Sequence, residues 1–512
     1  MTYQEIERYI SEIPKFTKKH SLSHTKRFLE ILQIPQGKMK ILHVAGTNGK
    51  GSVCAYLDAM LRSEGKRTGL FISPHLVKMN ERIMIDGVPV SDEVFSEVFT
   101  QTLGAVKQME AEGLEHPTFF EFLFGMGMLA FSQAEAEYVI LETGLGGRLD
   151  ATSATEDPEV CVITSIGLDH MEYLGDTVEQ IAGEKAGIIR PGVPVFYAQS
   201  TEESDRVIEK TAAQQGSSCK KIGKDAYEIL GIEDKHIAFS CTNAYYGTTT
   251  WKLNNIGSYQ PGNALLAMEV MQYLFREKGH VDRWREALAQ VKWQGRMEEI
   301  LPSVYVDGAH NVSAIDAFVK SVPETAEGNI FLFSAVKDKE YEEMIAQLCD
   351  SVPAEFYVVT LIDGERATDA ELLGKLFEKY TDRPVIVIES VQKALEYVLE
   401  HQEKRTVYCL GSLYLTGMVK ETVERMRKEK ADESRRRKTE GQQEKQKLEA
   451  ATDRKSSRHV GGYRQMLNYE EEIRKFKPSL EVEDIEDAVY EEDLTDMQDL
   501  LKEVMEKKKK KK

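Results

Sequence analysis

The chain has 512 residues, of which 41% are hydrophobic, and its formal net charge is −19. This length predicts two or three folding units, and the hydrophobic content is normal for a soluble globular protein. The negative charge argues against general binding to nucleic acids or membranes, because it repels phosphate groups. The six cysteines are scattered without a CxxC pair, which favours a reducing compartment over a cysteine zinc site or a disulfide framework.

The first 16 residues carry charges throughout and contain no apolar core of a signal peptide. The most apolar long stretch, 119–131, is interrupted by Glu121 and is too short to span a bilayer. We therefore expect a cytoplasmic protein.

Apolar strand-like runs alternate with helical patterns between residues 1 and 296. The runs 39–45, 68–72, 138–142 and 160–165 each end near a glycine or a polar turn. Such alternation predicts βαβ units around a mainly parallel sheet, hence an α/β fold. Ligands of such sheets bind beyond the carboxyl ends of the strands.

A second α/β series predicts a smaller Rossmann-like domain over residues 297–428, with Gly295 and the charged residues after it as a hinge. Its expected strands are 303–306, 329–333, 355–361, 384–388 and 406–410. From residue 429 to 512 the chain is a charged extension. We interpret 429–460 as a disordered linker or a solvated helix, 461–506 as containing a short helix, and the terminal lysine run as solvated.

A glycine-rich loop follows the first predicted strand, in the segment HVAGTNGKGS at 43–52. The loop residues are Thr47, Asn48, Gly49, Lys50, Gly51 and Ser52, and a helix is predicted over 53–62. Glycines let backbone N–H groups approach phosphate oxygens, and a lysine and a helix N-terminus both favour an anion. The spacing differs from the common GxxxxGK[ST] pattern, and the alternative is a tight turn beside a surface lysine. We predict binding of a nucleoside triphosphate.

Further unusual residues follow other predicted strands. These segments are SPHL at 73–76, ETGLGGRLD at 142–150, Asp169-His170, and IAGEKAGI at 181–188. Mg²⁺ takes hard oxygen ligands together with substrate phosphates, so Glu142 is a natural ligand and the Ser73 hydroxyl a second. Taken alone, Glu142 could equally be a helix cap or a surface group, and His170 a structural histidine.

Together these segments resemble folylpolyglutamate synthases of the Mur ligase superfamily. The resemblance covers residues 1–428 and rests on HVAGTNGKGS, SPHL, TFFE, ETGLGGRLDA, GLDHMEYLGDTVEQIAGEKAGI, PGNALLA, QGRME and VDGAHN in this order. It implies a P-loop ATPase domain, a monomer, and two Mg²⁺ ions. It also implies ATP-dependent ligation of L-glutamate to the γ-carboxylate of a tetrahydrofolate through an acyl phosphate. Whether dihydropteroate is also an acceptor stays open.

The resemblance assigns roles to individual positions. The implied metal ligands are Ser73, Glu142, His170 and a carbamylated Lys185. The implied ATP contacts are the loop 47–52, Asn263, Arg296 at the phosphates and Asp307 at the ribose. The implied pteroate contacts are Thr118, Phe119, Phe120, Glu121, Leu149, Asp150 and Ala151. Lys50 and Lys185 are expected to act in catalysis, and His310 and Ser412 to face the incoming glutamate.

Three departures from the family pattern leave these residues in place. Ser153 stands where asparagine is frequent, Gln294 where proline is common, and FSAVKDKE at 333–340 varies a usual segment. One alternative is a Mur-type ligase of peptidoglycan precursors, but those enzymes carry a whole domain before the phosphate loop, and here only about 45 residues precede it. Another is a scaffold that has lost catalysis, which the retained Lys50 and Glu142 argue against.

Overall fold

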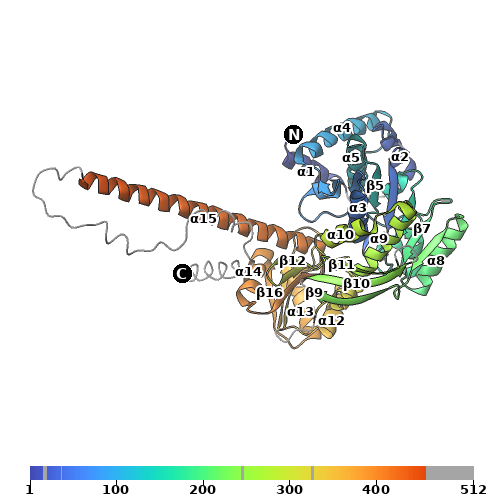
Figure 1. Ribbon diagram of the computed structural model, residues 1–512. Helices are drawn as coiled ribbons and strands as arrows, with labels where there is room; N and C mark the ends of the chain where they lie inside the picture. The colour runs from blue at the N-terminus through green and yellow to red at the C-terminus, as the bar shows by residue number, and fades with distance from the viewer. Residues whose placement is uncertain (15–19, 36, 234, 244–246, 324–327, 457–512) are drawn as a thin grey trace, which may run out of the picture. The chain divides into compact units, whose positions relative to one another are not determined.

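The computed structural model describes residues 1–14, 20–35, 37–233, 235–243, 247–323 and 328–456. The chain forms two compact units, one of residues 1–298 with 305–418, and the other of residues 299–304 with the chain from 419 onward. Figure 1 shows the elements in chain order. No helix in the described ranges is long and apolar enough to cross a membrane.

Within these described ranges the strands form three sheets. The first has the order β4-β3-β2-β5-β1-β6-β7-β8, the second β11-β10-β9, and the third β12-β13-β17-β14-β15-β16. Their bounds are β1 Lys40–Ala45, β2 Thr68–Phe71, β3 Ile83–Ile85, β4 Val88–Pro89, β5 Tyr138–Glu142, β6 Val160–Ile163, β7 Val195–Ala198, β8 Cys219–Ile222, β9 Tyr227–Glu233, β10 His236–Asn243, β11 Gly247–Leu253, β12 Glu298–Leu301, β13 Val304–Val306, β14 Asn329–Phe333, β15 Phe356–Leu361, β16 Val385–Ser390 and β17 Thr406–Leu410.

The helices connect and cover these strands. Their bounds are α1 Tyr3–Glu12, α2 Leu22–Ile31, α3 Lys50–Ser63, α4 Asp92–Ala111, α5 Phe119–Gln133, α6 Met171–Leu174, α7 Val178–Ala186, α8 Glu202–Gln214, α9 Gln260–Phe275, α10 Val281–Gln290, α11 Val312–Val319, α12 Tyr341–Ser351, α13 Ala370–Tyr380, α14 Val391–His401 and α15 Leu413–Ser456, with short 3₁₀ turns η1 Met79–Arg82, η2 Ala151–Ala154 and η3 Arg276–Lys278.

Both faces of the first sheet are buried at its central strands, which explains why these strands read as continuous apolar runs. Successive residues of β5 point to opposite faces: Val139 and Leu141 join the core formed with α1, α2, α4 and α5, whereas Ile140 joins the core formed with α3, α9 and α10. The strands β2, β5, β1, β6, β7 and β8 run parallel, so their carboxyl ends meet at one edge of the sheet.

The sequence predicted the parallel strands β1, β2, β5 and β6 closely, but it named neither the parallel β7 and β8 nor the antiparallel additions. β10 pairs antiparallel with β9 and β11, and β3 pairs antiparallel with β2. The predicted helix at 53–62 begins earlier, at Lys50, because the glycine-rich loop turns directly into it. The extension is helical to Ser456, one of the two expectations for 429–460, and α15 crosses the boundary predicted at 428. The short helix expected within 461–506 lies outside the described residues.

Candidate active site

The glycine-rich loop lies between β1 and α3, at the carboxyl edge of the first sheet. Gly46 has φ +150° and Gly49 has φ +89°, and an added Cβ at Gly46 would lie 1.8 Å from Thr164 Oγ1. α3 begins after Gly49 without a side-chain cap, so its first N–H groups remain open to an external acceptor. These groups and the helix dipole form an anion-binding site of the kind that holds phosphate.

The loop is held in place by its neighbours. Thr47 N–H donates to Ser165 O at 2.8 Å, and the Asn48 amide donates to Ser313 Oγ at 2.9 Å. Ser52 Oγ accepts a hydrogen bond from Gln260 Nε2 at 3.2 Å. These hydrogen bonds join three of the predicted loop residues to the surrounding fold.

Two lysines meet at one carbonyl of this loop. Lys50 Nζ donates to Gly46 O at 3.1 Å, and Lys185 Nζ, from α7, donates to the same oxygen at 2.7 Å. Lys185 is 4% exposed. Burial, together with the positive charge of Lys50, lowers the pKa of Lys185 to about 7. A substantial fraction of this amine is therefore neutral near physiological pH.

Glu142 ends β5 beside the loop, where the sequence placed it. Its side chain is buried, and its Oε2 accepts a hydrogen bond from Ser73 N–H at 3.0 Å. Burial raises the pKa of Glu142, although the nearby charges of Lys50, Arg296 and Arg82 oppose the rise. The Ser73 hydroxyl accepts from Arg82 at 3.3 Å. Two hard oxygen donors, the Glu142 carboxylate and the Ser73 hydroxyl, thus come from adjacent strands.

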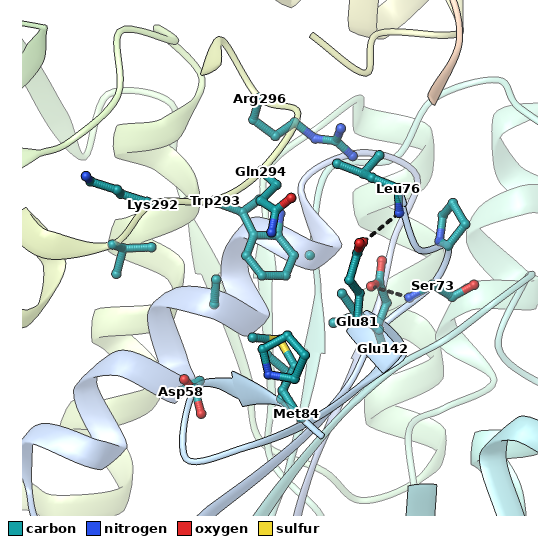
Figure 2. Close-up of a pocket in the computed structure, with 18 of the residues that line it drawn as sticks. Asp58, Ser73, Leu76, Glu81, Met84, Glu142, Lys292, Trp293, Gln294 and Arg296 are labelled. Carbon is teal, nitrogen blue, oxygen red and sulfur yellow. Dashed lines mark hydrogen bonds between the residues drawn. The ribbon is translucent and has the colours of Figure 1, made fainter. Parts of the chain in front are cut away.

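A cavity of about 230 Å³ opens beside these residues. It is lined by Gly51, Ser73, Glu142, Trp293 and Arg296, among others. Figure 2 shows Arg296, Trp293 and Glu142 around this space, with the Ser73 N–H directed at the Glu142 carboxylate. The phosphate loop, a carboxylate and an arginine therefore share one cavity.

A second polar cluster surrounds Asp169. Its carboxylate forms an ion pair with Lys339 and accepts a hydrogen bond from Asn311 Nδ2 at 3.1 Å. The Nε2 atoms of His170 and His310 each lie 3.9 Å from Asp169 Oδ2. Although burial alone would raise the pKa of Asp169, nearby positive charges outweigh it and hold that pKa well below its usual range: His310 and His170, which are charged only in acid, and Lys339.

Both histidines of this cluster are neutral near pH 7. Burial lowers the pKa of His170 to about 4, and burial and Lys339 lower that of His310 to about 3. His310 Nδ1 lies 2.6 Å from Gly308 O, so the ring is oriented with its proton on Nδ1. Neutral imidazoles can act as metal ligands or proton acceptors.

The remaining residues expected to contact ATP lie near the loop. An added Cβ at Gly49 would lie 2.4 Å from Asn263 Oδ1, so these two residues are in close contact. The buried Asp307 carboxylate accepts from Tyr259 OH at 2.8 Å and from the backbone N–H of Met297 at 2.9 Å. Arg296 NH1 donates to Gly295 O at 2.8 Å. Asp307 therefore organises the segment that carries Arg296.

The other expected glutamate contact, Ser412, lies just before α15. Its hydroxyl is buried and accepts from Tyr414 N–H at 3.2 Å. This hydrogen bond fixes the hydroxyl at the turn into the helix.

The residues expected to contact pteroate differ in how far they are buried. Thr118 and Glu121 form the capping box of α5, and Glu121 is buried. Phe119 and Ala151 are also buried, whereas Leu149 is 41% exposed and the half-buried Phe120 ring packs beside Gly144. The buried Asp150 accepts hydrogen bonds from Gly144 N–H and Leu145 N–H, both at 3.0 Å. Phe120 and Leu149 are thus the members of this group best able to touch a ligand directly.

Sequence reasoning assigned no role to Lys339, Asn311 or Trp293. Lys339 lies six residues beyond β14, within the segment that departs from the family pattern, and Asn311 is the last residue of VDGAHN. Both residues follow predicted strands, and this position could have marked them as candidate site residues. No sequence feature marked Trp293 as a site residue, because only the folded chain brings its indole against Gly51.

Comparison with protein families first identifies the class of the chain. The Mur ligase middle domain matches residues 93–271, and the Mur ligase glutamate ligase domain matches residues 295–413. These matches contain Glu142, His170 and Lys185 in the first segment and Arg296, Asp307 and His310 in the second. The chain is an ATP-dependent ligase of the Mur type.

The relatives narrow this class. The chain is 34% identical to the dihydrofolate synthase/folylpolyglutamate synthase of Bacillus subtilis (strain 168), over 82% of this chain and 98% of that protein. It is 28% identical to the folylpolyglutamate synthase of Lacticaseibacillus casei, over 83% of this chain and 99% of that protein. The chain belongs to the folylpolyglutamate synthase family.

Solved structures agree in fold along nearly their whole length. The folylpolyglutamate synthase of Mycobacterium tuberculosis complexed with ADP and AMPPCP is 26% identical, has a TM-score of 0.76, and covers 82% of this chain and 98% of that chain. E. coli FolC in complex with DHPP and ADP is 26% identical, has a TM-score of 0.72, and covers 83% of this chain and 99% of that chain. The expected α/β fold class is thereby confirmed.

Proposed function

We propose that this enzyme uses ATP to join L-glutamate to the γ-carboxylate of a tetrahydrofolate, and that dihydropteroate is a second acceptor. The observation that carries this proposal is the match to 98% of a relative named for both activities. A peptidoglycan-precursor ligase is disfavoured, because that alternative shares only the superfamily. We further propose a monomeric, cytoplasmic enzyme that binds neither nucleic acid nor membranes.

The reaction requires a carboxylate to approach a triphosphate. The folate carboxylate attacks the γ-phosphorus of ATP, which forms an acyl phosphate and releases ADP. The amine of glutamate then attacks the acyl carbon, and phosphate leaves from the tetrahedral intermediate. The N–H groups at the start of α3, with Lys50 and Arg296, offset the repulsion between the two anions. Each such donor typically contributes about 2.7–4 kcal/mol to lowering the barrier.

Two Mg²⁺ ions fit the donor set around the loop. Glu142 and Ser73 supply hard oxygen ligands, and the neutral His170 supplies an imidazole nitrogen. When bound, the ions would neutralise charge on the transferring phosphoryl group. Lys185 is suited to carbamylation, because its neutral amine can attack CO₂ and release a proton. The carbamate would keep one N–H for Gly46 O and replace a buried cation beside Lys50 by an anion.

The other polar residues serve binding and orientation. Asn263 and Asp307 would position the nucleotide, while Phe120 and Leu149, supported by the buried Asp150, would contact the pteroate. His310 and Ser412 would face the incoming glutamate. Trp293 would shield the acyl phosphate from water at the wall of the cavity.

Phosphate release with Mg·ATP and glutamate tests this proposal. We expect release with tetrahydrofolate and with dihydropteroate, and none without an acceptor. Release with tetrahydrofolate alone would remove the second activity. No release with either acceptor, from folded protein that still binds ATP, would refute the folate assignment.

A further inference from the structure

A histidine and glutamate cluster joins α2 to the start of α5. His20 Nδ1 lies 2.8 Å from Glu121 Oε2, and His24, four residues after His20, packs against it with ring centroids 4.0 Å apart. One ligand atom from each of His20, His24 and Glu121 lies within 4.8 Å of the other two. Zinc bonds to nitrogen and oxygen are about 2.0–2.2 Å long, so a modest inward movement of these side chains would let a single ion contact all three.

The Nε2 atoms of both histidine rings contact the same residue, Glu115. His20 Nε2 lies 3.0 Å from the Glu115 carboxylate, and His24 Nε2 lies 2.9 Å from the Glu115 carbonyl oxygen. Each Nε2 therefore carries a proton and donates it to Glu115. Metal-ligating histidines are held in this way, with one ring nitrogen on a carboxylate or carbonyl and the other facing the ion.

The Nδ1 atoms of the two rings are the candidate ligand atoms. His24 Nδ1 is buried and has no hydrogen-bond partner among the described residues, which is costly for a polar atom. His20 Nδ1 faces the buried carboxylate of Glu121. The other oxygen of that carboxylate accepts from Thr25 Oγ1 at 3.3 Å, and Thr118 N–H donates to Oε2 at 2.8 Å. These bonds fix the orientation of the third ligand.

We propose that His20 Nδ1, His24 Nδ1 and Glu121 Oε2 bind one Zn²⁺ ion, with a water molecule as the fourth ligand. Two imidazoles and one carboxylate are a recurrent zinc ligand set, whereas Mg²⁺ prefers oxygen ligands and keeps its waters. The ion would connect α2 to the first turn of α5. It is separate in chemistry from the Mg²⁺ ions proposed at Glu142, and the proposal does not depend on ligase activity.

Binding must release a proton when His20 is charged. Burial disfavours the charged ring, but hydrogen bonds and charges from Glu121 and Glu115 outweigh burial and raise the pKa of His20. Zn²⁺ takes the place of the proton that His20 Nδ1 shares with Glu121. Affinity should therefore fall as the pH is lowered through the pKa of this ring.

The test is a Zn²⁺ titration of the full-length protein against a chromophoric chelator, in excess Mg·ADP to occupy the active site, with retained metal measured by mass spectrometry. We expect one bound equivalent. His24→Gln and His20→Gln should each abolish it, and Glu115→Ala should weaken it by about 10–100-fold. The matched control is His116→Gln, since both nitrogens of that ring are engaged, by Tyr9 OH and Pro117 O.

Each outcome of the Zn²⁺ titration either supports or overturns the proposed site. Loss of the equivalent in both cluster variants, with circular dichroism unchanged and His116→Gln binding normally, supports the site. No retained Zn²⁺ in the unmodified protein would overturn the proposal. Retention of the full equivalent in His24→Gln would also overturn it, because the ion would then lie elsewhere.

Discussion

Replacing Lys185 by methionine should make the protein more stable and nearly inactive. Methionine keeps much of the side-chain volume but removes the amine that is buried beside Lys50 and Gly46 O. A charge kept in such a place costs stability, and functional sites commonly retain groups of this kind. The two effects of one substitution therefore have opposite signs.

The size of the stability effect follows from the pKa. A drop from 10.5 to about 7 corresponds to roughly 5 kcal/mol in favour of the neutral amine in the folded state. Part of this gain is offset by loss of the hydrogen bond to Gly46 O, so we expect Lys185→Met to stabilise the protein by about 1–4 kcal/mol at pH 6.

The stability gained by Lys185→Met should decrease as the pH rises. Between about pH 7 and 10.5 the unfolded chain binds a proton at Lys185 that the folded chain lacks. The stability of the unmodified protein therefore rises with pH in this window, by up to about 1.4 kcal/mol per pH unit. The advantage of Lys185→Met is complete below pH 7 and shrinks as the pH rises.

The assay is urea unfolding of both proteins from pH 6 to 9.5 in CO₂-depleted buffer, which keeps the amine unmodified. The control is Lys107→Met, which removes an exposed lysine from α4 and should give a small, pH-independent change. In bicarbonate buffer, Lys185→Met should lose at least about 100-fold in kcat. A stability difference that does not change with pH, or a variant with near-normal kcat, would refute the reasoning.

Three further predictions concern other parts of the chain. Glu142→Gln can keep the hydrogen bond from Ser73 N–H but loses the charge, so kcat measured by phosphate release should fall by about 10²–10³-fold while the fold is retained; normal kcat would exclude Glu142 as a metal ligand. Lys339→Met leaves the buried Asp169 without its ion-pair partner and should destabilise the protein by about 3–5 kcal/mol in urea unfolding at pH 7, whereas an unchanged midpoint would show that the pair contributes little. Removal of residues 429–512 should leave kcat unchanged, because every proposed site residue precedes Lys428; a large loss in a folded truncated protein would assign the extension a catalytic role.

The central parallel strands of the first and third sheets could be predicted because they are buried on both faces. Runs such as 138–142 and 406–410 match β5 and β17 residue for residue, since continuous apolar sequence followed by a polar turn is a strong local signal. The antiparallel sheet β9–β11 was missed. Its strands carry many exposed polar residues, as in the pattern of β11, so little periodicity marks them.

The candidate site was predictable where function requires unusual residues at strand ends. Unusual residues after predicted strands marked three parts of the site. These are the loop at Lys50, Glu142 after β5, and Asp169 with His170. The convergence of Lys50 and Lys185 on one carbonyl could not be read from the sequence, because 135 positions separate them and only the fold joins them. The cluster of His20, His24 and Glu121 was hidden for the same reason.

The central claim is glutamate ligation through an acyl phosphate, and isotope transfer tests it most directly. Tetrahydrofolate labelled with ¹⁸O in its γ-carboxylate would be incubated with Mg·ATP and glutamate, and products analysed by mass spectrometry. The mechanism predicts a folate longer by one glutamyl residue, with one ¹⁸O atom delivered to inorganic phosphate for each ligation. Phosphate that is released without ¹⁸O, or an unextended folate, would contradict it.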